Sequence, residues 1–202
     1  MAAFDVDGTL TTRDCVTPFL LRATRGGVVL ALLRRPLALG RALLHRDRDG
    51  LKALAARSLR GLDAAGLDRL GATFAHDFVT ERLRPDTTAR LRRHLALGHT
   101  VVLASASLEP YVVPIGESLG VHGVVCTRLE QDASGRLTGR LQGPNCRGPE
   151  KAQRLRAWLE SAGLAGAEVW AYGDSAGDAE LLREADHPVW VRRVEILPEP
   201  LG

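Results

Sequence analysis

The sequence of 202 residues has few cysteines, and they follow no pattern. Cys15, Cys126 and Cys146 are odd in number, and no two of them have the short spacing of a zinc or disulfide motif. Neither a disulfide scaffold nor a zinc site is therefore expected. A chain of this kind suits a reducing compartment, and we expect it in the cytoplasm.

Long apolar runs are also missing. The longest, "GGVVLALL", ends at Arg34, Arg35 and Pro36, well short of the ~18 uncharged residues that span a bilayer. The chain does not open on a basic segment followed by an apolar stretch, so no secretory signal is expected. Both observations agree with the expected cytoplasmic location.

Aromatic residues and lysines are scarce. Aromatics make up 4% of the chain, so Leu, Val and Ala must form most of the core. Of 27 basic residues only Lys52 and Lys151 are lysine. The net charge of +3 is too small to indicate a nucleic-acid partner, but it is unevenly spread. Residues 22–60 hold ten Lys or Arg against two Asp, about +8, which leaves about −5 elsewhere.

The hydrophobic pattern alternates between strands and helices outside residues 14–84. Such alternation predicts parallel βαβ units, and hence a doubly wound, Rossmann-like, three-layer α/β core. A hairpin is expected around Ser134-Gly135. The expected strands are "AAFDV", "TVVLASAS", "VHGVVCTRLE", "AEVWAYGDS" and "HPVWVRRV".

Residues 14–84 show only helical patterns, about four helices in succession. The first long one is expected to read "GVVLALLRRPLALGRALLHR". We therefore predict a catalytic core of residues 1–13 and 85–202, with a helical insertion of residues 14–84 between them.

Acidic and hydroxyl residues follow the predicted strands. In a parallel sheet the ligand lies beyond the carboxyl ends of the strands, so these residues are expected to share one edge. Crowded carboxylates repel each other unless a cation lies between them, and oxygen ligands without His or Cys favour Mg²⁺. Each residue alone has an ordinary structural explanation, but together they indicate a reaction centre. The set consists of Asp5, Asp7, Ser105, Ser107, Asp174 and Asp178, with Lys151 at a helix start.

Four segments in order, "DVDGT", "LASAS", Lys151 and "GDSAGD", resemble the motifs of the haloacid-dehalogenase superfamily of phosphohydrolases. The resemblance covers essentially the whole chain. The helical insertion resembles the C1 cap of that superfamily. "RLEQDASGRLTGRL" and "NCRGPEKAQRL" are most similar to its phosphoserine-phosphatase-like group, subfamily IB.

The resemblance implies Mg²⁺-dependent hydrolysis of a small phosphomonoester through an aspartyl-phosphate. It assigns the nucleophile to Asp5 and the general acid/base to Asp7, whose backbone carbonyl is expected on the metal. The resemblance also implies phosphate binding at Thr9, Ser105 and Lys151, with Thr9 supporting the loop that follows the first strand. It implies metal binding at Asp5, Asp174 and Asp178.

Substrate contacts are less defined. The resemblance places Asp14 where phosphoserine phosphatases contact the substrate amine, but Asp14 could equally be a helix N-cap. Arg57 is a candidate for binding a carboxylate, and Ser107 for a substrate contact or a loop hydroxyl. "SAS" instead of "SGG" and Gly177 instead of asparagine depart from the phosphoserine phosphatase pattern and weaken that assignment.

Several alternatives remain open. Arg34, Arg41, His45 and Arg48 recur at helical spacing among leucines, and a basic amphipathic helix can lie on an anionic membrane. This region resembles the caps of phosphatidylglycerophosphate phosphatases, although a solvated cap helix has the same pattern. A phosphotransferase and a non-catalytic phosphate-binding module are further possibilities. A phosphonatase-type reaction would need a cap lysine, for which Lys52 is the candidate.

Overall fold

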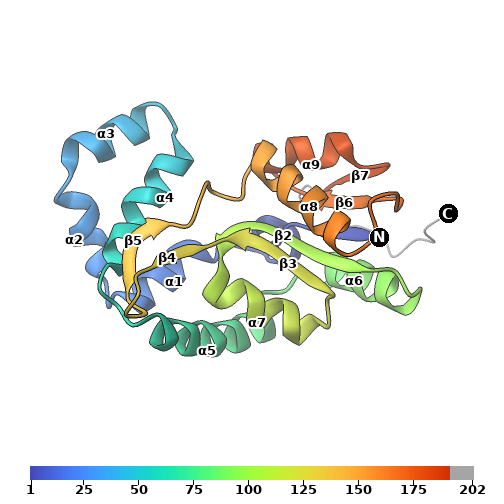
Figure 1. The fold of residues 1–202 in the computed structure, drawn as a ribbon, viewed down its shortest axis with the longest axis horizontal. Helices are drawn as coiled ribbons and strands as arrows, with labels where there is room; N and C mark the ends of the chain where they lie inside the picture. The colour runs from blue at the N-terminus through green and yellow to red at the C-terminus, as the bar shows by residue number, and fades with distance from the viewer. Residues whose placement is uncertain (192–202) are drawn as a thin grey trace.

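The computed structural model describes residues 1–191 and contains a parallel five-stranded sheet in the order β3-β2-β1-β6-β7 (Figure 1). The central strand β1 pairs with β2 on one side and β6 on the other, so that Phe4 lies beside Leu103 and Tyr172. The predicted last strand extended to residue 194, and its end lies outside the described residues. The strands are β1 Ala2–Phe4, β2 Val101–Leu108, β3 Gly123–Thr127, β6 Trp170–Gly173 and β7 His187–Trp190.

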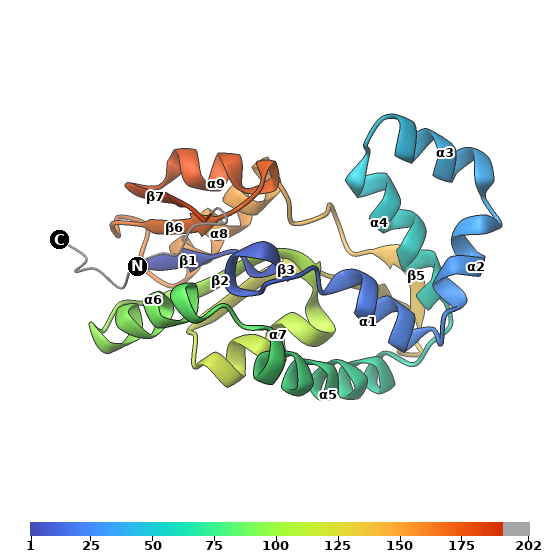
Figure 2. The same ribbon diagram turned by 180° about the vertical axis from the view of Figure 1, so that it is seen from behind.

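Helices cover both faces of the sheet (Figures 1 and 2). Successive strand residues point to opposite faces, so Phe4 and Leu103 pack with one pair of helices, while Ala3 and Val102 pack with the other. The expected doubly wound, three-layer α/β core is confirmed. The first pair is α6 Pro85–Ala96 and α7 Glu109–Leu119, and the second is α8 Pro149–Ser161 and α9 Ala179–Glu184.

The helical insertion leaves and rejoins the core at one point, where Thr11 and Leu83 form an antiparallel bridge. Three of its helices, α2 to α4, project away from the sheet (Figure 1). Its elements are α1 Val16–Ala23, α2 Gly27–Leu33, α3 Pro36–Leu44, α4 Arg48–Ala56, the 3₁₀ turn η2 Arg57–Leu59 and α5 Ala64–Arg82.

The single long helix predicted for residues 27–46 is wrong. The chain breaks between α2 and α3, where Arg35 has φ −131° and ψ 59°. Pro36 disfavours helical torsions in the preceding residue and cannot donate a backbone hydrogen bond, so it begins a new helix instead of continuing the old one.

Two contacts fix the base of the insertion to the core. Helix α5 lies so close to α7 that a Cβ on Gly71 would come within 1.9 Å of the Pro110 carbonyl oxygen. The expected hairpin, β4 Leu129–Gln131 and β5 Leu137–Leu141, is present and lies between α4 and α5 of the insertion (Figure 1). The Leu137 carbonyl of the hairpin accepts a hydrogen bond from the Gly61 amide of the insertion at 2.8 Å.

Within residues 1–191, no single helix has both the length and the apolar character to cross a bilayer. Helices α1 and α2 together are long and apolar enough, but the pair is bent by 102°.

Candidate active site

The first acidic pair lies where β1 ends. The chain leaves the strand at Asp5 and makes one irregular turn over Val6–Leu10, in which Gly8 has φ 82°. A Cβ at Gly8 would lie 2.4 Å from Asp174 Oδ2. Glycine is therefore required here twice, for its torsion and for the close approach of Asp174 to the turn.

Lys151 joins two of the carboxylates. Its side chain is almost fully buried, and its Nζ donates to Asp5 Oδ1 at 2.7 Å and to Asp178 Oδ1 at 2.5 Å. Removing charges from water is costly, so a buried cluster of this kind is weak evidence for a purely stabilising role. It indicates a site where charge is needed for chemistry.

Three carboxylates could hold a metal ion together. Oxygens of Asp5, Asp174 and Asp178 lie within 4.8 Å of one another. Asp178 is held in place because its Oδ2 accepts from the Ser175 amide at 3.1 Å and the Ser175 hydroxyl at 2.9 Å. An all-oxygen set of this size fits a hard divalent cation such as Mg²⁺. The metal contact expected from the Asp7 carbonyl stays a prediction.

The carboxylates in this cluster are hard to ionise together. Burial raises the pKa of Asp5 to about 7, although Lys151 opposes the rise. Burial and then Asp178 raise the pKa of Asp174. Burial lowers the pKa of Lys151, but the carboxylates of Asp5 and Asp178 outweigh it and hold the ammonium charged. A cation among the three carboxylates would favour their ionised forms, including the form in which Asp5 is a nucleophile.

Asp7 lies apart from this cluster and has different partners. Its Oδ1 accepts from the Cys15 amide at 2.9 Å, and its Oδ2 accepts from the Ser107 hydroxyl. Burial raises its pKa. A fixed carboxyl group with a raised pKa can hold and release a proton, which is what a general acid/base needs.

The three hydroxyl residues predicted for the site, Thr9, Ser105 and Ser107, are all buried. Ser105 is buried, and its Oγ accepts from the Ser107 amide at 3.0 Å. Ser107 contacts Asp7, a role that sequence reasoning did not assign to it. The backbone carbonyl of Thr9 accepts from Thr87 Oγ1 at 2.8 Å, which ties the first turn to α6. Phosphate binding by Thr9 and Ser105 stays a prediction.

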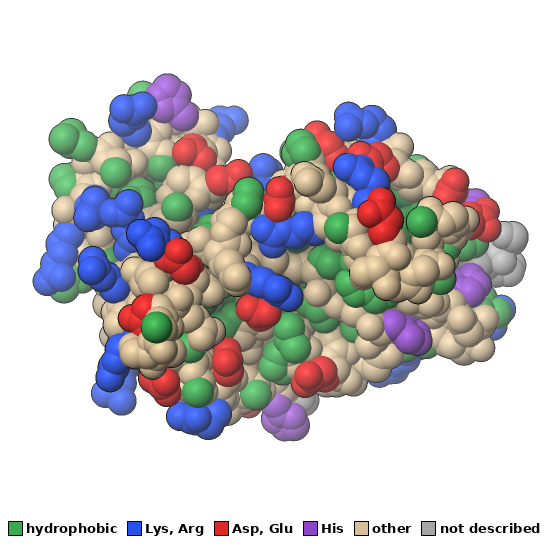
Figure 3. All heavy atoms as spheres, viewed as in Figure 1, with side chains coloured by type: hydrophobic (Ala, Val, Ile, Leu, Met, Phe, Trp, Pro, Cys, Tyr) green, Lys and Arg blue, Asp and Glu red, His purple; other side chains and the backbone are tan. Residues whose placement is uncertain are grey.

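A cleft of about 780 Å³ opens between the core and the insertion, and Figure 3 shows the hollow between the two lobes. Its floor is polar and contains Asp5, Asp7, Lys151 and Asp174. Its wall on the insertion side is mostly apolar, although Asp14, Arg48 and Lys52 also line it. The wall residues include Leu20, Leu21, Val28, Val29, Leu32 and Leu51.

The two cap candidates for substrate binding differ in position. Asp14 lines the cleft, and its Oδ2 also accepts from the Thr17 amide at 3.0 Å, which fixes Asp14 to the first turn of α1 although Cys15 is the N-cap. Arg57 is exposed on η2 and is not among the residues that line the cleft. Arg48 and Arg147 also line it; the sequence had placed Arg48 on the basic helix considered for an anionic lipid, whereas Arg147 was assigned to no site.

The insertion also reaches the core through Lys52 on α4. Its Nζ donates to the Ala106 carbonyl and to Asn145 Oδ1 at 3.1 Å, and burial lowers its pKa. Asn145 Nδ2 in turn donates to Asp49 Oδ1 at 2.6 Å. We call these contacts of Lys52 and Asp49 with Asn145 and Ala106 the cap latch. Asn145 begins the segment "NCRGPEKAQRL", which resembles the phosphoserine-phosphatase-like group, but no motif predicted that its partners would be Lys52 and Asp49.

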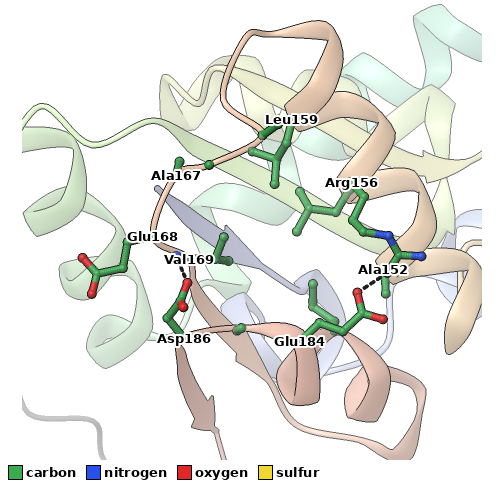
Figure 4. A pocket seen from close by; sticks show the side chains of 13 residues that line it. Ala152, Arg156, Leu159, Ala167, Glu168, Val169, Glu184 and Asp186 are labelled. Carbon is green, nitrogen blue, oxygen red and sulfur yellow. Dashed lines mark hydrogen bonds and ion pairs between the residues drawn. The ribbon is translucent and has the colours of Figure 1, made fainter.

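A second hollow, of about 460 Å³, lies between α8, α9 and the segment before β6 (Figure 4). Its residues precede β6 and β7, at the edge of the sheet opposite to Asp5. Its charged groups are satisfied locally, since Arg156 pairs with Glu184 and Asp186 accepts from the Val169 amide at 2.8 Å. Such a hollow is not arranged for phosphate chemistry, so the first cleft is the active-site candidate.

Comparison with known proteins decides the family. The family model for haloacid dehalogenase-like hydrolases matches residues 2–183. The chain belongs to this family. The predicted family is thereby confirmed, and the protein is an enzyme of the phosphatase class.

Individual proteins match nearly all of the chain. Protein CicA of Caulobacter vibrioides is 38% identical over 187 residues, which are 92% of this chain and 83% of CicA. The phosphoserine phosphatase of Halobacterium salinarum is 33% identical over 198 residues, 95% of this chain and 85% of that enzyme. A crystal structure of a protein with unknown function from Bordetella pertussis Tohama I matches with a TM-score of 0.69 and 26% identity, covering 91% of this chain and 85% of that one.

Proposed function

We propose that this enzyme hydrolyses a phosphomonoester in a Mg²⁺-dependent reaction through an aspartyl-phosphate on Asp5. The observation that carries the proposal is the arrangement at the cleft floor. The Asp5 carboxylate shares Lys151 with Asp178 and lies in a cluster suited to a divalent cation, while Asp7 is held separately by Cys15 and Ser107. Two neighbouring acids thus have different environments, as different roles require.

In the first step a carboxylate oxygen of Asp5 attacks phosphorus, and the bond from phosphorus to the substrate alcohol oxygen breaks. Asp7 in its protonated form gives its proton to that leaving oxygen. In the second step Asp7, now ionised, takes a proton from a water molecule, whose oxygen attacks phosphorus. The bond between phosphorus and the Asp5 oxygen breaks, inorganic phosphate leaves, and both aspartates return to their starting forms.

Charge neutralisation supports both steps. A Mg²⁺ ion held by Asp5, Asp174 and Asp178 would offset the negative charge of the phosphoryl oxygens. Lys151 holds Asp5 in position and places a second positive charge beside it. Because Lys151 is fixed by Asp178 as well, its ammonium does not have to be reoriented during the reaction.

The mechanism is tested by replacing Asp5 with asparagine. Asp5→Asn should release no phosphate from p-nitrophenyl phosphate and should not bind beryllofluoride, a mimic of the aspartyl-phosphate, because the amide is not a nucleophile. Asp186→Asn, which changes an acid at the opposite edge of the sheet, serves as the control and should keep wild-type turnover. Turnover retained in Asp5→Asn would sink the mechanism.

The substrate we infer first is a small phosphomonoester resembling phosphoserine. It is supported by the 33% identity to a phosphoserine phosphatase and by the position of Asp14 in the cleft, where its carboxylate could pair with an amine. The apolar wall favours a second candidate, a lipid phosphomonoester such as phosphatidylglycerophosphate. Rates on these two substrates, with and without Mg²⁺, separate the candidates.

The same measurements separate two other activities. A phosphotransferase would phosphorylate an added acceptor alcohol instead of releasing phosphate. A non-catalytic module would bind phosphate without turnover of any ester.

A further inference from the structure

The insertion exposes an unusual amount of apolar side chain. Among the residues that the structure describes, seven of the nine exposed large hydrophobic residues lie between Leu21 and Leu44. Leu37 is 85% exposed and Leu44 is 79% exposed. Contiguous exposed apolar surface on a soluble domain commonly marks an interaction site. Five of the seven are on α2 or α3 and do not line the cleft: Leu30, Leu33, Leu37, Leu43 and Leu44.

Positive charge surrounds these leucines. Arg34, Arg35, Arg41 and Arg46 lie on the same two helices or at their ends, and all four are exposed. The sequence contains no acid between Arg22 and Arg46. Within residues 1–191, none of the four arginines forms an ion pair. In Figure 3 blue basic and green apolar side chains mingle on this outer part of the insertion.

We propose that α2 and α3 form a docking surface for an anionic lipid membrane. This surface, the cap face, consists of the five leucines and four arginines named above. Leucines would enter the boundary between head groups and acyl chains, while the arginines stay at the level of the anionic head groups. The two helices are short, about 10 to 14 Å each, which suits shallow binding in the plane of the membrane.

The charges select this partner over two others. A symmetric dimer through the cap face would place the arginines of one copy against those of the other, which is unfavourable without acids to pair them. Nucleic acid would pair its phosphates with the arginines but would leave the large exposed leucine side chains in contact with water. An anionic membrane satisfies both kinds of side chain together.

The cap face is continuous with the catalytic cleft. Leu21 and Val29 are exposed at the surface and also line the cleft wall, on α1 and α2. An apolar path therefore runs from the docking surface towards Asp5. On a docked enzyme, a lipid phosphomonoester could bring its head group to the cleft floor while its acyl chains remain beside the wall. This statement about the substrate rests on the phosphatase activity proposed above, whereas the docking does not.

The docking is tested by sedimentation of the full chain with vesicles of phosphatidylcholine, with and without phosphatidylglycerol. The wild type should sediment with the vesicles that contain phosphatidylglycerol and should be released by high salt, because exposed charge attraction is screened. Arg34→Gln with Arg41→Gln should lower the partition coefficient by about tenfold or more, since each basic residue near the surface contributes roughly fivefold. The double variant Leu37→Ser with Leu44→Ser should also lower the partition coefficient, although its net charge equals that of the wild type.

A matched control is available at the C-terminal end of α6, away from the insertion in Figure 1. Leu97 and Arg93 are exposed there, and Leu97→Ser with Arg93→Gln should bind vesicles as the wild type does. Hydrolysis of soluble p-nitrophenyl phosphate should be unchanged in all these variants, because none of the altered residues lines the cleft.

Three results would overturn the docking. They are no binding of the wild type to anionic vesicles, unaltered binding by the cap-face variants, and a concentration-dependent dimer that the same variants dissociate. The last result would assign the cap face to a second copy of the chain. Absence of p-nitrophenyl phosphate hydrolysis in the wild type would instead contradict the proposed phosphatase function and leave the vesicle result to decide the docking.

Discussion

At the scale of single residues, His94 shows how the core constrains a titratable group. Its ring is buried against the sheet, with Nε2 2.9 Å from the Tyr172 hydroxyl and Nδ1 2.9 Å from His99 Nδ1. Burial lowers its pKa to about 4, while a histidine in the unfolded chain titrates near 6.5. At pH values between about 4 and about 6.5, His94 is therefore mostly protonated in the unfolded chain and mostly neutral in the folded protein.

We therefore expect the free energy of unfolding to fall as the pH is lowered from about 6.5 towards about 4. Urea unfolding of the wild type and His94→Gln at a series of pH values measures this. The variant should be less stable at neutral pH and should lose part of the pH dependence. His45→Gln, which alters an exposed histidine, should keep the wild-type slope. An identical slope in His94→Gln would contradict the assignment.

The grouping of residues at the cleft floor was largely predictable from the sequence. Asp5, Asp174 and Asp178 follow or lie near strand ends, and parallel strands bring those ends to one edge. Lys151 could be selected because lysine is so rare here. The hydrogen bond that the Ser107 hydroxyl donates to the Asp7 carboxylate could not be predicted, because it depends on how two loops turn after their strands. Spacing along the chain carries no information about such side-chain directions.

At the scale of elements, the cap latch connects α4 to the core. Asn145 contacts Lys52 and Asp49 of the insertion, and it also accepts from Thr127 Oγ1 at 2.7 Å. Asn145→Ala removes these bonds, each worth about 1 kcal/mol, and leaves the Lys52 ammonium with fewer partners in a buried place. We expect a Tm lower by several degrees and a KM that rises more than kcat falls, because α4 then covers the cleft less firmly.

Thermal unfolding and steady-state kinetics with p-nitrophenyl phosphate measure both effects. Gln142→Ala, an exposed change in the same connection, is the control. Lys52→Met should shift KM in the same direction as Asn145→Ala. Wild-type KM and Tm in both latch variants would show that these contacts do not hold α4 on the core.

Elements in the core were easier to predict than those in the insertion. The strands were predicted because buried parallel strands read as apolar runs. The insertion was predicted as helical, but one of its helices had to be divided at Pro36. The hairpin of residues 129–141 was expected too, whereas its packing against the insertion was not, since nothing in a local pattern says which distant element will cover it.

At the scale of the whole molecule, the crowded carboxylates link metal binding to stability. A ligand that binds only the folded state raises stability in proportion to the logarithm of its concentration. We expect Mg²⁺ to raise the Tm of the wild type, because it removes repulsion among Asp5, Asp174 and Asp178. Asp174→Asn should abolish most of this increase and should be more stable than the wild type without Mg²⁺.

Differential scanning calorimetry with MgCl₂, and with NaCl at matched ionic strength, tests this expectation. Asp186→Asn should respond to Mg²⁺ as the wild type does. An equal rise in Tm with both salts would mean that screening, and not a bound cation, causes the effect.

The insertion, although continuous in sequence, is divided by its packing. Helix α5 buries Phe74, Ala75 and Phe78 and lies against α7, so its backbone belongs to the same cooperative unit as the sheet. Helices α2 and α3 each bury a single residue, Val28 and Ala42. With so little apolar surface removed from water, these two helices can open at a free energy far below that of global unfolding. The part of the enzyme proposed to meet the membrane is thus the part that the core restrains least.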